Sequence, residues 1–391
     1  MIARNEERSI PRALYLLEDF MDREGEVLVL DTGSSDGTDA IAKRRGCRVE
    51  SVHDRFDVIL TPEQATTIDR QFAKTGEGPL VKGGGRVFNF GAARQYAGWL
   101  ASHDFVLQLD ASDELSALNI DWLNEQILSG QAGSFEYDQV YGAMRHRIAR
   151  FYNRNLFHWE GRIHETLVPN EDADVSSVPQ LRCGANQLVV HHSPQHKERS
   201  YLAGLALQVL ETPENPRWRH LLGRELFYER WFRSAIAVLE VHTKMDLAWD
   251  AERSQSWCFM GECLTAIGRP QEAEEAYCRS IEVDPTRRQP HLDLAAVYSR
   301  RGDFANAARC AKSALAIPPT SAYPELEANY TWRPHSLLYW SLFWLGRRDE
   351  AREHWERFLA LVPEENIPRD HARMFPPKAD GTKRNSLHAE D

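Results

Sequence analysis

The pattern of apolar and polar positions changes in character about halfway along the chain. In roughly the first 200 residues, short apolar runs alternate with segments of helical periodicity. Two runs, at 26–31 and 105–110, have the mostly apolar character of buried strands, and each ends in an aspartate, Asp31 and Asp110. Strands that alternate with helices predict an α/β domain with a mostly parallel sheet, whose ligands bind at the carboxyl ends of the strands.

Helices are expected between these strands. Apolar residues recur on one face of 9–21, where Ser9 is a suitable N-cap, and similar patterns cover 38–45 and 92–100. A polar, glycine-rich stretch at 54–89 interrupts the alternation. It is predicted to be either a mobile lid over the site or a surface insertion.

Residues 216–363 follow a repeating pattern. A glycine, an alanine and a proline recur in three copies, with a constant spacing of 17 residues between glycine and proline. They are Gly268, Ala273 and Pro285; Gly302, Ala307 and Pro319; and Gly346, Ala351 and Pro363. A weaker copy around Gly223 and Ala235 precedes them. In such a unit the glycine ends one helix, the alanine allows close helix contact and the proline ends the second helix.

This spacing resembles the tetratricopeptide repeat, which consists of pairs of antiparallel helices. Repeats of this kind commonly form binding grooves or oligomer contacts. The alternative is that they pack against the N-terminal half and support it. A protein partner or a homo-oligomer is therefore a possibility that the repeats raise.

Composition narrows the class of protein. The chain has 391 residues, of which 42% are hydrophobic and 27% charged, as in ordinary globular proteins. No apolar stretch approaches the ~18–20 residues of a membrane span, and the first residues lack the apolar block of a signal peptide. Six dispersed cysteines without a CxxC pair favour reduced thiols, so we expect a cytoplasmic protein. The net charge of −11 argues against a surface built throughout for nucleic acid or anionic membranes.

Four motifs occur in order in the N-terminal half, and two more follow. They are IARNEE at 2–7, VLDTGSSDGT at 29–38, FNFGAAR at 88–94, LQLDASDEL at 107–115, GRIHE at 161–165 and LVVHH at 188–192. Together with the repeats they resemble a bacterial branch of inverting family-2 glycosyltransferases with the GT-A fold. The resemblance implies an α/β plus all-α protein. Its parts would be a GT-A (Rossmann-like) domain with a mostly parallel sheet over 1–200, a tetratricopeptide-type helical solenoid over 201–367 and a polar tail over 368–391.

The resemblance also implies a nucleotide-sugar donor, in the first place a UDP-sugar. The residues expected to bind it are Ala3, Asn5, Glu6, Asp31, Gly33, Ser34, Arg94 and Asp110. Asp31 can accept a hydrogen bond from a uracil-like N–H, and the guanidinium of Arg94 can pair with base or phosphate oxygens. The alternative for the Asp31 motif is a capped turn that begins the next helix.

A divalent cation, Mn²⁺ or Mg²⁺, would neutralise the diphosphate in such an enzyme. The usual Asp-x-Asp pattern is altered here, because Ser112 stands where the second aspartate is expected. Asp113 can replace it, so the predicted ligands are Asp110, Asp113 and His192, with His191 as an alternative to His192. A metal-independent site is the other possibility.

Inverting transfer needs a general base beside the acceptor hydroxyl. The resemblance assigns this role to Glu165, with His164 orienting it or contacting the sugar. The alternative is that Glu165 forms an ion pair with Arg162 or another nearby arginine.

The acceptor stays open between a glycan, a protein or peptide, and a hydroxymethylated DNA base. Arginines and aromatic residues alternate along 144–162, which suits DNA, but a positively charged wall around the diphosphate explains them as well. The competing class is a non-catalytic repeat scaffold with a degenerate nucleotide-sugar-binding domain. Ser112 favours this class, and so does the shortened first strand, of which only residues 1–2 are present. That strand is either vestigial or begins upstream of Met1.

Overall fold

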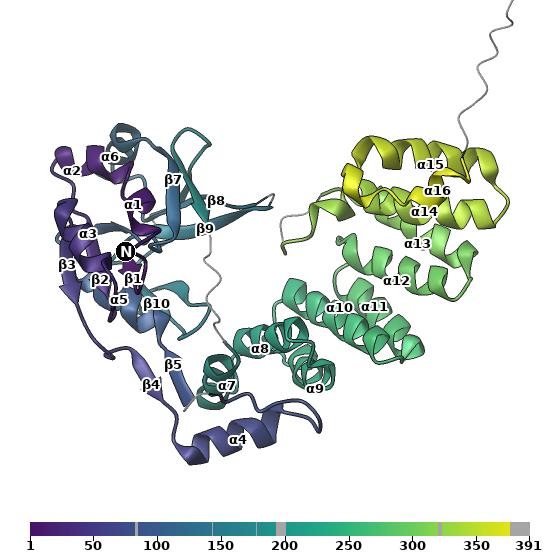
Figure 1. Ribbon diagram of the computed structural model, residues 1–391, viewed down its shortest axis with the longest axis horizontal. Coiled ribbons are helices and arrows are strands. Elements are labelled where there is room, and N and C mark those ends of the chain that lie inside the picture. The colour runs from purple at the N-terminus through teal and green to yellow at the C-terminus, as the bar shows by residue number, and fades with distance from the viewer. Residues whose placement is uncertain (83–84, 143, 177, 193–200, 320–322, 376–391) are drawn as a thin grey trace, which may run out of the picture. The chain divides into compact units, whose positions relative to one another are not determined.

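The computed structural model describes residues 1–82, 85–142, 144–176, 178–192, 201–319 and 323–375 (Figure 1). The chain divides into two compact units, Met1–Gly268 and Arg269–Asp391. The first unit combines sheets with helices, and the second is helical in its described part. Among the described residues, every helix falls short of the length and apolar character that a membrane span requires.

A three-stranded parallel sheet forms the first part of the N-terminal unit. Its strands, in the order β1-β2-β3, are β1 (Ile2–Ala3), β2 (Leu28–Asp31) and β3 (Arg48–Ser51). Helix α3 (Thr38–Arg44) connects β2 to β3. An isolated parallel bridge joins Ile2 to Asp110 on the other side of β1. The carboxyl ends of β2, of β1 and of the segment that leads to Asp110 therefore lie side by side.

A six-stranded mixed sheet forms the second part. Five strands follow the order β6-β9-β8-β13-β7, and the sixth, β12, pairs with β8. The strands are β6 (Phe105–Leu107), β7 (Asp113–Leu118), β8 (Ser134–Tyr141), β9 (Met144–Asn153), β12 (Gln180–Arg182) and β13 (Leu188–His192). The prediction of one mostly parallel sheet is therefore wrong, because the sheets are small and the larger one is mixed. The antiparallel strands β8 and β9 contain polar and charged residues among their apolar ones, and they lack the continuous apolar run that marks a buried parallel strand.

The helix predicted over 9–21 is divided into α1 (Ile10–Ala13) and α2 (Leu17–Asp22). A tight turn separates them, in which the amide of Leu17 donates to the carbonyl of Leu14. Ile10, Ala13, Leu14 and Leu17 are all buried, so the division keeps the predicted apolar stripe in the core. Two later helices, α5 (Phe90–Leu100) and α6 (Ile120–Leu128), each begin after an asparagine whose side chain caps the first turn.

The glycine-rich insertion at 54–89 contains regular structure. Strands β4 (Asp57–Ile59) and β5 (Arg86–Phe88) pair, and α4 (Pro62–Phe72) lies between them in sequence. After α4, the carboxylate of Glu77 accepts hydrogen bonds from the amides of Arg233 (3.0 Å) and Ser234 (2.8 Å). The insertion is thus anchored to a helix of the same unit, which favours a surface insertion over a mobile lid. Gly83 and Gly84 lie outside the described residues.

The helical region begins inside the first unit. Its helices there are α7 (Leu202–Glu211), α8 (Pro216–Tyr228), α9 (Phe232–Thr243) and α10 (Asp250–Ala266). Residues 202–209 are all buried, and α7 packs against α4 and β5 (Figure 1). The compact units meet at Gly268, so α7 to α10 belong to the same unit as the sheets, whereas the sequence groups these helices with the repeats from residue 201.

The second unit consists of successive helices with short connections between them. They are α11 (Pro270–Val283), α12 (Gln289–Arg300), α13 (Phe304–Ala316), α14 (Trp332–Trp344), α15 (Arg348–Leu361) and α16 (Arg369–Ala372), with short 3₁₀ turns at Glu327–Asn329 and Glu364–Asn366. The predicted repeat is confirmed in detail. Gly268, Gly302 and Gly346 adopt φ of 78°, 77° and 76° after α10, α12 and α14. Ala273, Ala307 and Ala351 are fully buried, and a proline follows each second helix within three residues.

The predicted polar tail is partly packed. Phe375 is buried, and its ring stacks on Trp355 with a centroid distance of 5.3 Å. Residues 368–375 therefore belong to the folded unit, whereas the rest of the predicted tail, 376–391, lies outside the described residues.

Candidate functional site

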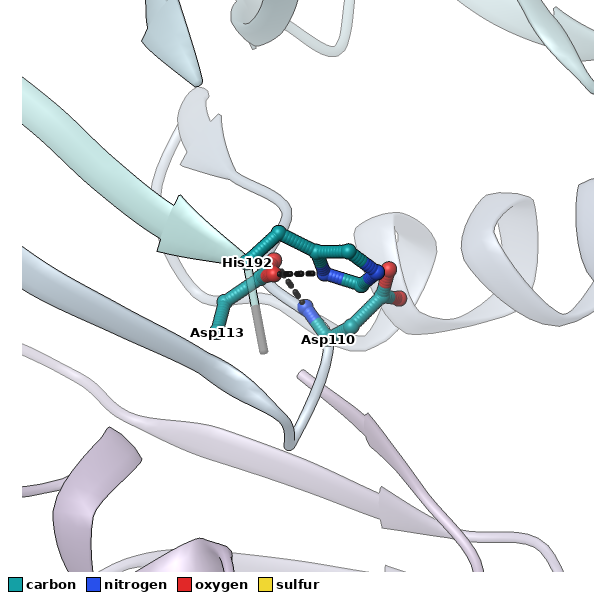
Figure 2. A group of neighbouring side chains, drawn as sticks. All are labelled: Asp110, Asp113 and His192. Carbon is teal, nitrogen blue, oxygen red and sulfur yellow. Dashed lines mark hydrogen bonds and ion pairs between the residues drawn. The ribbon is translucent and has the colours of Figure 1, made fainter. Parts of the chain in front are cut away.

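Two carboxylates and an imidazole meet where β7 and β13 lie next to each other. Asp110 and Asp113 occupy a tight turn, in which the side chain of Asp113 accepts the amide of Asp110 at 2.8 Å. His192, the last residue of β13, lies opposite Asp113 in the antiparallel register. Its Nδ1 is 2.6 Å from a carboxylate oxygen of Asp113. One ligand atom from each of the three residues lies within 4.8 Å of the others (Figure 2).

This trio matches the predicted metal ligands. Carboxylate oxygens with an imidazole nitrogen suit Mn²⁺ and tolerate Mg²⁺, so the donor set fits the cation that the resemblance implies. Asp113, and not Ser112, supplies the second carboxylate. His191 is exposed and lies opposite Glu114, so the trio contains His192 rather than its neighbour. The hydrogen bond to Asp113 raises the pKa of His192 and outweighs the effect of its burial.

Arg94 joins this trio to Glu165. The Arg94 side chain, on α5, is only 2% exposed. Its Nη2 donates to Asp110 at 2.7 Å and its Nε donates to Glu165 at 2.5 Å. Its Nη1 is buried and has no hydrogen-bond partner among the described residues. Arg94 was predicted to face a nucleotide, and here two of its three nitrogens bind carboxylates.

A second arginine completes the cluster. Arg150, on β9, donates to the other oxygen of Asp110 at 3.1 Å and lies 3.9 Å from Glu165. Burial alone would raise the pKa of Asp110, but the charges of Arg94 and Arg150 hold it well below its usual range. The sequence placed Arg150 in the arginine-rich stretch at 144–162 and gave no individual signal for this contact.

The Asp31 motif forms a turn at the end of β2. The Asp31 carboxylate accepts the amide of Ser34 at 3.0 Å, and the Ser34 hydroxyl accepts the amide of Asn5 at 2.9 Å. Gly33 has a φ of 105°, which explains the glycine. The side chain of Asp36 also accepts the amide of Thr38, the first residue of α3, at 3.0 Å. The capped-turn alternative is therefore correct as a description of the local structure, and a donor-binding role for Asp31 stays a prediction.

Two further predicted donor-binding residues, Ala3 and Glu6, belong to β1 and to the loop after it. Ala3 ends β1, paired with Asp31, and its carbonyl accepts from the amide of Thr32 at 2.9 Å. Glu6 is buried, and its carboxylate accepts the hydroxyl of Ser9. Glu6 thus stabilises the start of α1, while Asp31, Ala3 and Asp110 follow one another along the edge of neighbouring strands.

The two predicted catalytic residues have different surroundings. Glu165 forms the ion pair that was its alternative interpretation, but with Arg94 and Arg150. Arg162 pairs instead with Glu211 of α7. The imidazole of His164 lies 3.0 Å from Arg224 and 3.3 Å from Glu225, so it faces α8 and not Glu165.

The comparisons with known proteins match the helical repeats of this chain. A family model described as "Tetratricopeptide repeat" matches residues 254–287. This match supports a tetratricopeptide repeat in the helical part of the chain, which follows sheets and helices in the N-terminal unit.

Individual relatives carry the same repeat in their descriptions. "TPR repeat-containing protein Synpcc7942_0270" of Synechococcus elongatus is 26% identical over 340 residues, which cover 82% of this chain and 75% of that protein. "Inactive TPR repeat-containing thioredoxin TTL3" of Arabidopsis thaliana is 28% identical over 107 residues, 27% of this chain and only 15% of that protein. Among solved structures, the crystal structure of MamA is 18% identical and covers 41% of this chain and 86% of its own, with a TM-score of 0.35.

The Synechococcus protein resembles more than the helices. Residues 201–375 make up less than half of the chain, so an alignment that covers 82% of it includes part of the α/β unit. The family model and the two relatives support the tetratricopeptide repeat. The glycosyltransferase resemblance of the N-terminal unit stays a prediction.

Proposed function

We propose that the N-terminal unit binds a nucleotide-diphosphate sugar, a UDP-sugar in the first place, and transfers its sugar with inversion to an acceptor hydroxyl. One observation carries the proposal: Asp110, Asp113 and His192 lie within 4.8 Å of one another, next to the buried guanidinium of Arg94. Such a site combines ligands for a hard cation with positive charge at the carboxyl ends of parallel strands, where ligands of α/β sheets bind.

Each group has a separate task in this proposal. Asp31 binds the base, two strands away from Asp110. A divalent cation held by Asp110, Asp113 and His192 would supply charge neutralisation for the diphosphate. Arg150 adds positive charge at the same place, since its side chain reaches Asp110.

Glu165 is the proposed base, and its ion pairs set a condition on that role. Its carboxylate accepts from Nε of Arg94 at 2.5 Å. Both arginine contacts are to its Oε1, so Oε2 is the oxygen that would take a proton from an acceptor hydroxyl. Arg94 and Arg150 then remain beside the reacting groups as fixed positive charges.

The repeats support a protein or peptide as acceptor or as recruiting partner, because helical repeats of this kind are commonly protein-interaction modules. A DNA acceptor is less well supported, since the net charge of −11 opposes approach to a polyanion.

A non-catalytic repeat scaffold is the second candidate. Two observations favour it: Glu165 is engaged in ion pairs with two arginines, and the matched relatives are described by their repeats. In that case the repeats would carry the function and the α/β unit would bind a nucleotide at most.

Calorimetric titration with UDP and a panel of nucleotide sugars, with and without Mn²⁺, tests the first proposal. We expect Mn²⁺-dependent binding that Asp113→Asn and His192→Gln weaken on the order of tenfold or more, since each removes one ligand of three. The matched controls Ser112→Ala and His191→Gln should bind as the wild type does. Glu165→Gln should keep donor binding and lose transfer. Absence of nucleotide binding in the wild-type chain would favour the scaffold.

A further inference from the structure

The segment Gly161–Glu165 is held by the helical region of the first unit. Gln208 of α7 is buried, and its side-chain oxygen accepts the amides of both Arg162 and Ile163, the second at 2.8 Å. Its side-chain nitrogen donates to the carbonyl of Ile163 at 3.4 Å. One glutamine side chain thus binds three backbone groups of this segment, which have no regular secondary structure to bind them.

The next residue, His164, is held from α8. Its φ is 55°, a left-handed conformation that is uncommon for a residue with a side chain. Arg224 and Glu225 of α8 lie 3.0 and 3.3 Å from its Nε2, and the ring of Tyr201 lies 5.5 Å from its centre. Contacts from the helices therefore maintain an unfavourable backbone angle directly before Glu165.

The same segment is pressed against the start of α5. The amide of Phe90 donates to the carbonyl of Arg162 at 2.8 Å. A methyl group added at Gly91 would collide with the carbonyl oxygen of Gly161, and one added at Gly161 would collide with Trp218 of α8. The segment therefore lies between α5, which carries Arg94, and α8. This close packing fixes Glu165 relative to Arg94.

We infer that Gln208 and Glu225 are positioning residues for Glu165: acting from α7 and α8, they fix the backbone that holds its carboxylate against Arg94 and Arg150. This inference rests on the proposed function, in which Glu165 is the base. It makes two helices outside the predicted catalytic domain part of the catalytic machinery. Neither residue belongs to a motif, because their partners are backbone groups and a side chain far away in sequence.

The test compares two substitutions of Gln208 that differ in one property. Gln208→Met keeps the length of the side chain and removes the acceptor for the amides of Arg162 and Ile163, whereas Gln208→Glu keeps an acceptor. Gln126→Met, in α6 of the same unit, is the matched control. Backbone hydrogen exchange of 161–166, donor affinity by calorimetry, and kcat for donor turnover are measured on the full chain.

We expect Gln208→Met to speed exchange at Arg162 and Ile163 and to lower kcat, each on the order of tenfold or more, since one buried and one partly buried amide lose their acceptor. Donor affinity should stay within about twofold, because Gln208 does not reach the Asp110 trio. Gln208→Glu should recover most of kcat, and Gln126→Met should match the wild type. If Gln208→Met fails to fold, Glu225→Met tests the same inference through His164.

Three outcomes would overturn the inference. Unchanged exchange in both variants would mean that the helices do not hold the segment. Faster exchange with unchanged kcat would reduce Gln208 to a structural residue. A wild-type chain that turns over no nucleotide sugar would remove the proposed function itself, and this failure is seen before any variant is compared.

Discussion

Arg94 in the first unit and Arg287 in the second are both fully buried, and their partners differ in kind. Arg287 in the helical unit is fully buried, and its partners are Glu325, at 3.1 Å, and Gln289, at 3.3 Å. The carboxylate of Glu325 also accepts the amide of Gln289. Arg287 thus joins the start of α12 to the connection after α13. Arg94 in the α/β unit binds two carboxylates, one of which belongs to the metal-ligating trio.

The difference shows that burial of a charge does not identify a site. The pair of Arg287 and Glu325 is satisfied by protein groups and packs one connection between helices. The cluster around Arg94 combines two arginines with two carboxylates, and its Nη1 has no partner in the described part of the chain. A buried charge marks a candidate site when its partners include groups that a ligand could also bind.

The largest expected effect tests this contrast directly. Arg287→Met should lower the free energy of unfolding by about 3–5 kcal/mol, because it leaves the buried carboxylate of Glu325 without its cation. Arg94→Met should fall at the lower end of this range, about 3 kcal/mol, because Arg150 still lies beside Asp110 and Glu165. The exposed arginine of the Arg269–Glu272 pair provides the control, and Arg269→Met should cost less than about 1 kcal/mol. Urea unfolding measures all three.

Ligand-induced stabilisation separates the two arginines further. If the α/β unit binds a nucleotide sugar with Mn²⁺, the added ligand should stabilise the wild type and Arg287→Met, but not Arg94→Met. The contrast would be wrong if Arg287→Met lost this stabilisation, or if Arg94→Met unfolded with the wild-type free energy.

The same two regions differ in what the sequence predicts. Gly302 and Ala307 were predicted from spacing, because each acts within one pair of neighbouring helices. Asp110, Asp113 and His192 lie together as the motifs implied, since Asp110 and Asp113 form the turn into β7 and His192 ends the neighbouring strand β13. The hydrogen bonds of Arg150 to Asp110 and of Gln208 to Ile163 join segments that are distant in sequence. No periodicity or motif predicts them.

A second prediction concerns two histidines of the first unit, His242 in its helical part and His192 in its larger sheet, whose pKa values shift in opposite directions. His242 of α9 is fully buried, and burial lowers its pKa to about 4. The unfolded chain binds a proton at this side chain below about pH 6.5, whereas the folded chain does not. The free energy of unfolding should therefore fall as pH decreases from about 6.5 to 4, by on the order of 2 kcal/mol.

Substitution isolates this contribution from that of the carboxylates. His242→Gln should show a smaller loss over the same range in urea unfolding at several pH values. His192→Gln, in metal-free buffer, is the matched comparison. Its raised pKa gives stability that is present below about pH 6.5 and lost as pH rises, so its removal should change the slope in the opposite direction. Parallel pH profiles for the wild type and His242→Gln would contradict the assignment.

The smallest expected effect concerns the glycines that end helices in the two units. It tests whether both are required for the same reason, a left-handed backbone angle. Gly130 follows α6 and Gly302 follows α12, with φ of 70° and 77°. In each case the glycine amide donates to a carbonyl three residues earlier, at 3.1 Å, and an added methyl group would meet no atom within 4 Å. The cost of Gly130→Ala and Gly302→Ala is therefore backbone strain alone, about 1 kcal/mol for both, and asparagine should cost less than alanine at either position.

Equal losses of unfolding free energy in urea would show that the repeat glycine is an ordinary helix terminator, which the sequence reveals only through its regular spacing. A much larger cost at Gly302 would mean that the regular stacking of the helices, and not the local angle, requires glycine there.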